Sequence, residues 1–587
     1  MSKPCTLLRT DFYKLCHLNM YDPRVVRMTS YLTPRGSRFP EQEWVMMFGL
    51  QMFVHRYLLK DFDNNFFSLP WEEIEEQYKT VLEKSLLYSE KEYGPTLEKV
   101  KALHDLGYLP IKVRGLPEGK KVPVGVPCVE ISVTDDRFAW VGQAVECLLS
   151  CSIWHPMVSA TVGYRYRELA HEFAKKSSDK SDGTMSMCDF SLRGQESMES
   201  AVASSAGWLA SMKNSSTVPA RALIEECYPA TDKDALQVYG LTSTEHSVMT
   251  TDFAINGDER ETYRRLLTEV YPNTSFAAVC DSYDYWNVLT NILPSLKDEV
   301  NAHNGFIGVR HDSADPVEAL CGIPQISVNL LPDEGFVRGC VRVITESHKF
   351  EAYSHEKFGQ EFTVYAVEYI NGEQSQSRLV TGKFVLDHVD DVIYKVTSVE
   401  NRERTWEEKG MVESIYDLFG GTVNSKGYKV ANPHVKAVYG DSITLGRAKE
   451  IFERLDAKKF SIDCISLGVG SFSMEAVEWD GKLYPFTRDT FSIAIKCTWA
   501  QLKDGTRIPV YKDPKGFTGK KSQKGLCLVT EDPEKGYVFT DGHLDPEPLE
   551  ADPRNAMITY FVDGSEAEGP QRDFAYVRGN VDQYFKN

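Results

Sequence analysis

Short apolar runs that end in polar clusters recur through the middle of the chain. Apolar runs of this length, bounded by turn residues, are typical of buried strands. After one cluster, apolar residues from Ala448 to Leu455 recur at the spacing of one helix face. A repeated order of strand, polar tip and helix predicts a β/α barrel, whose chemistry lies at the C-terminal strand ends. The polar clusters occupy residues 244–247, 280–284, 310–313, 440–442 and 468–471.

Changes in this pattern divide the chain. The first part mixes strand-like and helical stretches, and the last part is rich in Asp, Glu, Pro and Gly and is predicted to cover the surface. Between two barrel parts, β-rich runs flank Asn371-Gly372, which is a strong hairpin signal. The predicted parts are an α+β domain, a first barrel part, a small β-rich insertion, a second barrel part and an acidic C-terminal segment, at residues 1–165, 166–329, 330–415, 416–530 and 531–587.

Composition narrows the class of protein. The chain has 587 residues, 42% of them hydrophobic and 26% charged, which indicates a multidomain globular protein. A formal net charge of −19 argues against nucleic-acid binding, because phosphate backbones demand a basic face. The thirteen cysteines include no Cys-x-x-Cys pair, so we expect reduced thiols in the cytoplasm. No 18-residue apolar run and no signal-type N-terminus occur, so neither membrane insertion nor secretion is expected.

The predicted strand ends carry charged groups suited to a sugar phosphate. Arg193 and Arg310 end apolar runs, and guanidinium groups bind phosphates through two parallel hydrogen bonds. The small residues at 468–471 offer backbone N–H groups for a phosphate. Three carboxylates at strand ends could accept hydrogen bonds from sugar hydroxyls or hold water around Mg²⁺: Asp284, Asp312 and Asp441. Taken singly, each has a structural alternative, because Arg–Asp pairs often only hold barrel loops together.

His246 has two interpretations from the residues alone. A lone histidine is more often structural than catalytic. Here it follows Glu245, whose carboxylate could orient the imidazole and raise its basicity, as a histidine that accepts a phosphoryl group or contacts a diphosphate requires. The other histidines show no ligand spacing, so no structural metal site is predicted.

Ordered motifs along nearly the whole chain, apart from the insertion and the acidic segment, resemble the nicotinamide phosphoribosyltransferase family. The resemblance implies a type II phosphoribosyltransferase fold, an irregular β/α barrel packed on an α+β domain. It also implies a homodimer whose active sites are shared between subunits. The motifs include Asp11-Phe12-Tyr13-Lys14, Asp189-Phe190-Ser191-Leu192-Arg193-Gly194, Thr244-Glu245-His246-Ser247, Arg310-His311-Asp312-Ser313, Tyr439-Gly440-Asp441 and Thr487-Arg488-Asp489.

The resemblance also assigns roles to residues. Phe190 and Tyr13 of the partner subunit would enclose the pyridine ring. The residues that resemble the diphosphate and ring-substituent contacts are Arg193, His246 and Arg310, and those that resemble the ribose contacts are Asp312, Gly440 and Asp441; His246, Asp312 and Arg310 are the catalytic candidates. Gly470 and Ser471 occupy the place of the 5′-phosphate loop. Basic residues that resemble those reaching this loop from the other chain are Arg488, Lys496 and Lys512.

The activity that the resemblance implies is transfer of a phosphoribosyl group from phosphoribosyl diphosphate to nicotinamide in NAD salvage. Mg²⁺ would accompany the diphosphate, and ATP would phosphorylate His246 as a stimulating co-substrate. Ser216 stands where the nicotinamide enzymes carry an aspartate, so nicotinate remains an alternative base. Phe472, beside the phosphate loop, leaves ADP-ribose pyrophosphate as an alternative donor that would give NAD directly. A nucleotide-binding scaffold without activity is the non-enzymatic alternative.

Overall fold

The computed structural model describes residues 4–228, 236–331, 335–346, 361–370, 373–386, 392–513 and 522–586. The chain forms two compact units, each assembled from separate stretches of sequence. Unit 1 comprises Met1–Arg165, Ser191–Val238 and Ser471–Asn587, and unit 2 comprises Tyr166–Phe190 and Tyr239–Gly470.

A seven-stranded antiparallel sheet forms the centre of unit 1. Its middle strands bury nearly every side chain in turn. Because successive side chains point to opposite faces, the sheet is covered on both sides. The strands, in their order across the sheet, are β21 (Arg507–Pro509), β20 (Ile493–Leu502), β1 (Val25–Pro34), β5 (Val129–Val133), β3 (Ile111–Gly115), β24 (Ile558–Val562) and β25 (Ser565–Glu566).

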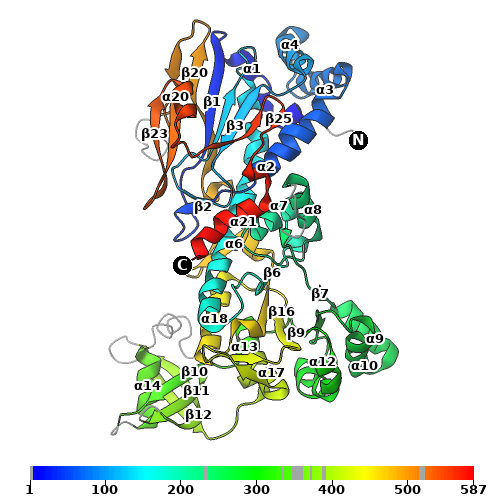
Figure 1. The fold of residues 1–587 in the computed structure, drawn as a ribbon, viewed down its shortest axis with the longest axis vertical. Coiled ribbons are helices and arrows are strands. Elements are labelled where there is room, and N and C mark those ends of the chain that lie inside the picture. The colour runs from blue at the N-terminus through cyan, green and yellow to red at the C-terminus, as the bar shows by residue number, and fades with distance from the viewer. Residues whose placement is uncertain are drawn as a thin grey trace. The chain divides into compact units, whose positions relative to one another are not determined.

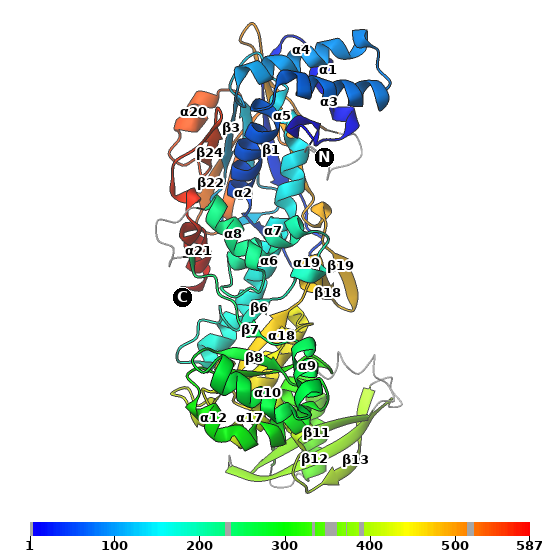
Figure 2. The ribbon, with the colours of Figure 1, turned by 90° about the vertical axis from the view of Figure 1, so that its right-hand side faces the viewer.

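Helices and short hairpins complete unit 1. Helices α3 (Trp71–Lys84) and α4 (Glu90–Leu106) lie side by side (Figure 2), and a capping box between Ser89 and Glu92 starts the second of them. Further elements are α7 (Met198–Leu209), α8 (Val218–Cys227), α21 (Phe574–Asp582) and the strand pairs β2 (Trp44–Met46) with β4 (Lys121–Pro123), β18 (Ala476–Trp479) with β19 (Lys482–Pro485), and β22 (Leu526–Asp532) with β23 (Gly536–His543). The long helix α6 (Glu146–Ser177) runs from the residues of unit 1 into those of unit 2.

The C-terminal stretches enter the sheet of unit 1, which differs from the boundaries expected from the sequence. Strand β20 falls in the predicted second barrel part, yet it pairs with β1 over its whole length. Strand β24 falls in the segment predicted to cover the surface, yet its Phe561 is fully buried and it pairs with β3. Pairing between strands hundreds of residues apart leaves no local signal, so the pattern alone could not assign these strands to their sheet.

A six-stranded parallel sheet forms the centre of unit 2. The predicted α/β class, with parallel strands that end in polar clusters and are followed by helices, is confirmed. The predicted helix after Asp441 is α18 (Leu445–Ala457), and it buries Ala448, Ile451, Phe452 and Leu455. The strands, in their order across the sheet, are β6 (Met187–Asp189), β17 (Ile465–Val469), β16 (Val435–Tyr439), β9 (Ile307–His311), β8 (Phe276–Val279) and β7 (Thr242–Ser243).

Helices flank this parallel sheet. Figure 1 shows α13 (Pro316–Cys321) and α17 (Met411–Phe419) beside it, and both pack against β16. The helices α9 (His246–Asn256), α10 (Glu259–Arg265) and α12 (Lys297–Ala302) follow strands β7 and β8 along the chain. Because all six strands are parallel, their C-terminal ends meet at one edge, where the polar clusters gather.

A second sheet in unit 2 includes the stretch that was expected to be a β-rich insertion. Strand β10 (Gln325–Asn329) pairs in parallel with β11 (Glu361–Ile370), while β12 (Glu373–Leu386) is antiparallel to both β11 and β13 (Val392–Glu400). Helix α14 (Phe336–Glu346) packs on it through a core that includes Phe336, Val364 and Val380. The predicted Asn371-Gly372 turn lies outside the described residues.

Two further properties concern membrane spans and cysteines. None of the helices in the described part of the chain has both the length and the apolar character needed to cross a bilayer. All thirteen cysteines lie in that part, and each is a free thiol.

Candidate active site

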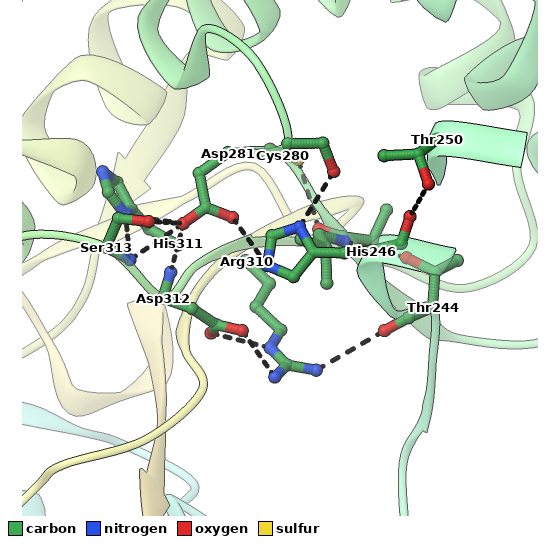
Figure 3. A network of polar contacts seen from close by, with 12 residues as sticks. Thr244, His246, Thr250, Cys280, Asp281, Arg310, His311, Asp312 and Ser313 are labelled. Carbon is green, nitrogen blue, oxygen red and sulfur yellow. Dashed lines mark hydrogen bonds and ion pairs between the residues drawn. The ribbon is translucent and has the colours of Figure 1, made fainter. Parts of the chain in front are cut away.

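Arg310 and Asp312 form a fixed ion pair at the C-terminal end of β9 (Figure 3). The Arg310 Nε donates to Asp312 Oδ1 at 2.8 Å, and Nη2 donates to Oδ2 at 2.6 Å. Nη1 also donates to the Ser243 hydroxyl, at 3.1 Å, at the end of β7. Both charged side chains are largely buried, so the guanidinium is held in one orientation before any ligand arrives.

Glycines make room for these side chains. A Cβ on Gly440 would lie 2.1 Å from Asp312 Oδ1 and 2.2 Å from Arg310 Nε. A Cβ on Gly470 would lie 2.1 Å from Asp441 Oδ1. Because Arg310 and Asp312 are fixed by each other, a side chain at residue 440 could fit only by displacing the ion pair.

Replacing Gly440 with alanine should therefore lower kcat/KM by about 10²-fold, since a shift of about 1 Å in a positioned group can cost that much. The fold should survive, because the displaced atoms belong to the site. Gly446→Ala is the matched control: Gly446 lies in α18 with no atom within 4 Å of the added Cβ, and it should keep full activity. Steady-state kinetics and melting temperatures of both variants test this. Full activity of Gly440→Ala would show that the ion pair tolerates displacement.

Two residues that follow the acidic strand ends have strained backbones. Ala314 has φ of 95° and Ser442 has φ of 65°, a region that residues with a side chain seldom occupy. Such conformations persist where the surrounding structure imposes them, and they concentrate at functional sites. The strain supports the assignment of this edge of the sheet as the active site.

The structure brings Phe190 to the same edge as Arg310. Phe190 follows β6, and its N–H donates to the carbonyl of Val469, at the end of β17, at 2.8 Å. Its ring centroid lies 5.9 Å from Arg310 Cζ. The predicted ring-stacking residue and the predicted diphosphate-binding cation are therefore neighbours, although they are far apart in sequence.

His246 is the first residue of α9, and its side chain is half exposed. Its Nδ1 lies 3.0 Å from the Ser282 hydroxyl, and its Nε2 lies 3.9 Å from Asp281 Oδ1. The N-terminus of a helix favours negative charge, so this position suits a phosphoryl group on the ring. The expectation that Glu245 orients the ring is wrong: Glu245 accepts a hydrogen bond from the Ser247 hydroxyl, and Asp281 is the carboxylate that faces the imidazole.

Asp281 is a site residue that the sequence analysis did not single out. Its Oδ2 accepts hydrogen bonds from the N–H of Asp312 at 3.0 Å, the N–H of Ser313 at 2.8 Å and the Ser313 hydroxyl at 2.6 Å. Burial alone would raise the pKa of Asp281, but His311 and these donors hold it well below its usual range. The available signal was its position two residues after the end of β8, close behind a buried strand as Asp312 is behind β9. Asp284, which was predicted, accepts from the N–H of Asn287 and caps the short helix α11 (Tyr285–Asn287).

The predicted residues of unit 1 fall into two groups. The first lies near helix ends: Arg193 is exposed on the 3-10 helix η5 (Leu192–Gly194), and Ser216 is partly buried just before the N-cap of α8. A Cβ on Gly194 would lie 2.2 Å from the Ser471 hydroxyl, which places Ser471 beside the Arg193 loop. Tyr13 is exposed on the 3-10 helix η2 (Phe12–Lys14), edge-on to His17.

The second group forms a basic cavity. Lys496, Lys512, Arg35 and Ser522 line a space of about 240 Å³. Burial lowers the pKa of Lys496, and the nearby positive charges of Arg35, Lys14 and Lys512 add to this effect, while Glu146 opposes it. Arg35 was missed by sequence reasoning, because it follows no apolar run that ends in a polar cluster. Arg488 begins the 3-10 helix η11 (Arg488–Thr490) and is exposed. A cavity of clustered cations is suited to a phosphate.

Comparison with known proteins establishes the family. The model of the "Nicotinate phosphoribosyltransferase (NAPRTase) family" matches residues 185–360 and 386–541, more than half of the chain. The chain belongs to this family. It is accordingly an enzyme, a pentosyltransferase that acts on small molecules. A second model, "Nicotinamide phosphoribosyltransferase, N-terminal domain", matches residues 5–113, which include Tyr13.

Curated relatives extend over most of the chain. A protein named nicotinamide phosphoribosyltransferase in Acinetobacter baylyi is 30% identical, covering 90% of this chain and 89% of its own length. One with the same name in Xanthomonas campestris is 25% identical, covering 95% of this chain and 94% of its own. A solved nicotinate-nucleotide pyrophosphorylase from Pyrococcus furiosus aligns with a TM-score of 0.49 at 11% identity, over 99% of this chain and 97% of that one.

Proposed function

We propose that this member of the nicotinate phosphoribosyltransferase family transfers a phosphoribosyl group from phosphoribosyl diphosphate to nicotinamide, giving nicotinamide mononucleotide and pyrophosphate in NAD salvage. The observation that carries the proposal is the fixed Arg310–Asp312 pair beside Phe190. Relatives named nicotinamide phosphoribosyltransferase match this chain over about nine tenths of their length, which supports it. An aromatic face, a guanidinium and a carboxylate are the groups that a pyridine ring, a diphosphate and a ribose need.

The chemistry is a displacement at the anomeric carbon. The pyridine nitrogen forms a bond to this carbon while the bond to the diphosphate oxygen breaks, through a state with oxocarbenium character. Phe190 aligns the ring, Arg310 neutralises the leaving diphosphate, and Asp312 holds the ribose with Asp441. Since all of these groups are positioned before the reaction, alignment and charge stabilisation supply the rate enhancement.

Mg²⁺ fits this site as a companion of the diphosphate. In the described part of the chain, no three His, Cys, Asp or Glu side chains gather as a metal site. Mg²⁺ commonly keeps several waters and is held largely by substrate phosphates. The exposed carboxylates of Asp284 and Asp441 would accept hydrogen bonds from that water. When bound, the ion shares the charge of the leaving group.

His246 is proposed to accept the γ-phosphoryl group of ATP. Asp281 faces Nε2, which favours the tautomer with the proton on Nε2 and the lone pair on Nδ1. Attack by Nδ1 on the γ-phosphorus forms the N–P bond as the bond to the bridging oxygen breaks and ADP leaves. The ring proton stays on Nε2, where the ionised Asp281 balances the positive charge. The helix N-terminus stabilises the new phosphoryl group.

We also propose that the protein works as a cytoplasmic homodimer with shared sites, in which Tyr13 and the basic residues of the 240 Å³ cavity serve the site of the partner subunit. The exposed aromatic ring of Tyr13 and the free thiols of all thirteen cysteines support these two parts of the proposal.

Mixing two inactive variants tests the shared site. Tyr13→Ala removes the proposed stacking ring, and Arg310→Ala removes the diphosphate-binding cation. In a shared site, subunit exchange at equal amounts should restore about a quarter of the activity, because half of the dimers are mixed and each contains one intact site. Activity of the mixture after exchange, verified by mass, is the measurement. No recovery would place both residues in the site of one subunit.

Release of pyrophosphate tests the activity itself. The purified protein, supplied with nicotinamide, phosphoribosyl diphosphate and Mg²⁺, should release one pyrophosphate for each nicotinamide consumed. Omission of either substrate should stop the release. Binding of both compounds without turnover would leave the chain as a scaffold and overturn the proposed function.

A further inference from the structure

His311 is a buried histidine that contacts the carboxylate facing His246. It is the last residue of β9, and only 7% of its side chain is exposed. Its Nδ1 lies 3.5 Å from Asp281 Oδ2 and 3.1 Å from the N–H of Ser313. Its ring packs against that of Tyr285 at a centroid distance of 4.1 Å and is stacked with that of Tyr439 at 6.1 Å.

The two oxygens of Asp281 have different surroundings (Figure 3). Oδ2 is surrounded by the Asp312 N–H, the Ser313 N–H and hydroxyl, and the ring of His311. Oδ1 is buried and makes no hydrogen bond among the described residues, and His246 Nε2 lies 3.9 Å from it. A single carboxylate therefore connects a buried histidine to the half-exposed one.

Such an arrangement fixes the direction of the carboxylate. The donors around Oδ2 determine where Oδ1 points, and the ring of His311 closes the side on which the carboxylate could otherwise rotate away. Burial and packing against the rings of Tyr285 and Tyr439 restrict the turning of His311 itself. The hydrogen bond made by one ring nitrogen of a histidine sets the state of the other. For metal-binding histidines, losing the group behind the ring typically costs 10- to 100-fold, and we expect an effect of that size here.

We propose that His311 is a positioning residue for the phosphorylation of His246: through Asp281 it keeps Oδ1 directed at His246 Nε2, so that the opposite ring nitrogen presents its lone pair to ATP. The inference rests on the proposed role of His246 as phosphoryl acceptor. In this role His311 acts through Asp281 and forms no bond in either reaction.

Three substitutions of His311 in the full-length protein test whether it positions Asp281 for the phosphorylation of His246. His311→Leu keeps much of the volume and removes the polar group. His311→Asn keeps an amide close to the position of Nδ1, whereas His311→Gln moves the amide toward the position of Nε2. His303→Leu is the matched control, because His303 is an equally buried histidine of unit 2 that packs on Phe276 and has no contact with Asp281 among the described residues.

The rate of acid-labile phosphorylation of His246 from labelled ATP is the deciding measurement. We expect His311→Leu and His311→Gln to slow it by 10- to 100-fold, and His311→Asn to keep it within threefold of the unmodified protein. Phosphoribosyl transfer without ATP should stay within about threefold in every variant, and His303→Leu should phosphorylate normally. If His311→Leu does not fold, the contrast between the asparagine and glutamine variants decides.

The possible failures can be told apart. Phosphorylation at the unmodified rate in His311→Leu, or in His311→Gln, overturns the positioning role alone. An equal loss in the asparagine and glutamine variants also overturns it, because the position of the polar group would then be irrelevant. If the unmodified protein forms no phosphohistidine while it still makes nucleotide, the ATP step falls together with this inference, and the proposed transfer activity stands.

Discussion

The Arg310→Lys variant is expected to lose about 10²- to 10³-fold in kcat/KM for phosphoribosyl transfer, the size of effect seen when one positioned electrostatic donor is removed from an active site. Lysine keeps the positive charge but cannot make the two parallel hydrogen bonds that fix Arg310 on Asp312 at 2.8 and 2.6 Å. It would also release the contact to the Ser243 hydroxyl. We therefore expect weaker neutralisation of the leaving diphosphate and a less fixed orientation of the Asp312 carboxylate.

The control for this variant is Arg507→Lys. Arg507 also binds carboxylates through its fork, on Asp545 and Glu547, but it does so at the surface of unit 1. Surface ion pairs contribute little to stability, so this variant should keep both activity and melting temperature. An Arg310→Lys protein with normal kcat/KM would mean that only the charge matters, and the fixed geometry would lose its proposed role.

The His246→Ala variant is expected to lose ATP hydrolysis and acid-labile phosphorylation completely, because no other group in the proposed step can form the N–P bond. Transfer of the phosphoribosyl group without ATP should continue at a reduced rate, since Arg310 still faces the diphosphate. Stability should change little because the His246 side chain is half exposed. ATP turnover, phosphate incorporation and transfer are measured on the same preparation.

His543→Ala provides the comparison, because His543 lies in β23 of unit 1 and its ring contacts the Thr540 hydroxyl near the surface. It should retain full phosphorylation. Undiminished ATP turnover in His246→Ala would assign the phosphoryl acceptor to another residue, and Asp281 would lose its proposed function with it.

The parts of the site that could be predicted from sequence are those that follow a strand directly. Arg310, Asp312, Gly440 and Asp441 come immediately after apolar runs, and parallel pairing then places them at one edge of the sheet. Phe190 was predicted from the motif resemblance, and the short strand β6 brings it beside Arg310. Local pattern and the rule of parallel strands were sufficient for the first four residues, whereas Phe190 also needed the resemblance.

Other parts depend on side-chain directions that a pattern does not contain. Glu245 and Asp281 both lie next to polar residues in the sequence, yet only Asp281 points at His246. Arg35 lines the basic cavity with Lys496 and Lys512. It comes close to them because β1, which ends just before Arg35, pairs with β20 so that Tyr31 lies opposite Lys496. More than 450 residues separate the two strands in sequence. Long-range antiparallel pairing also explains why β20 and β24 lie in the sheet of unit 1 instead of in the predicted barrel part and surface segment.

Competition between substrates tests the central claim most directly. The purified protein receives equal amounts of nicotinamide and nicotinate together with equal amounts of phosphoribosyl diphosphate and ADP-ribose pyrophosphate, and mass spectrometry identifies the first nucleotides formed. The proposed function predicts that nicotinamide mononucleotide is the main product. The acid nucleotide as the main product would make nicotinate the substrate and change the role of Ser216. Direct formation of NAD faster than of nicotinamide mononucleotide would contradict the phosphoribosyl donor and point to Phe472 as an adenine contact.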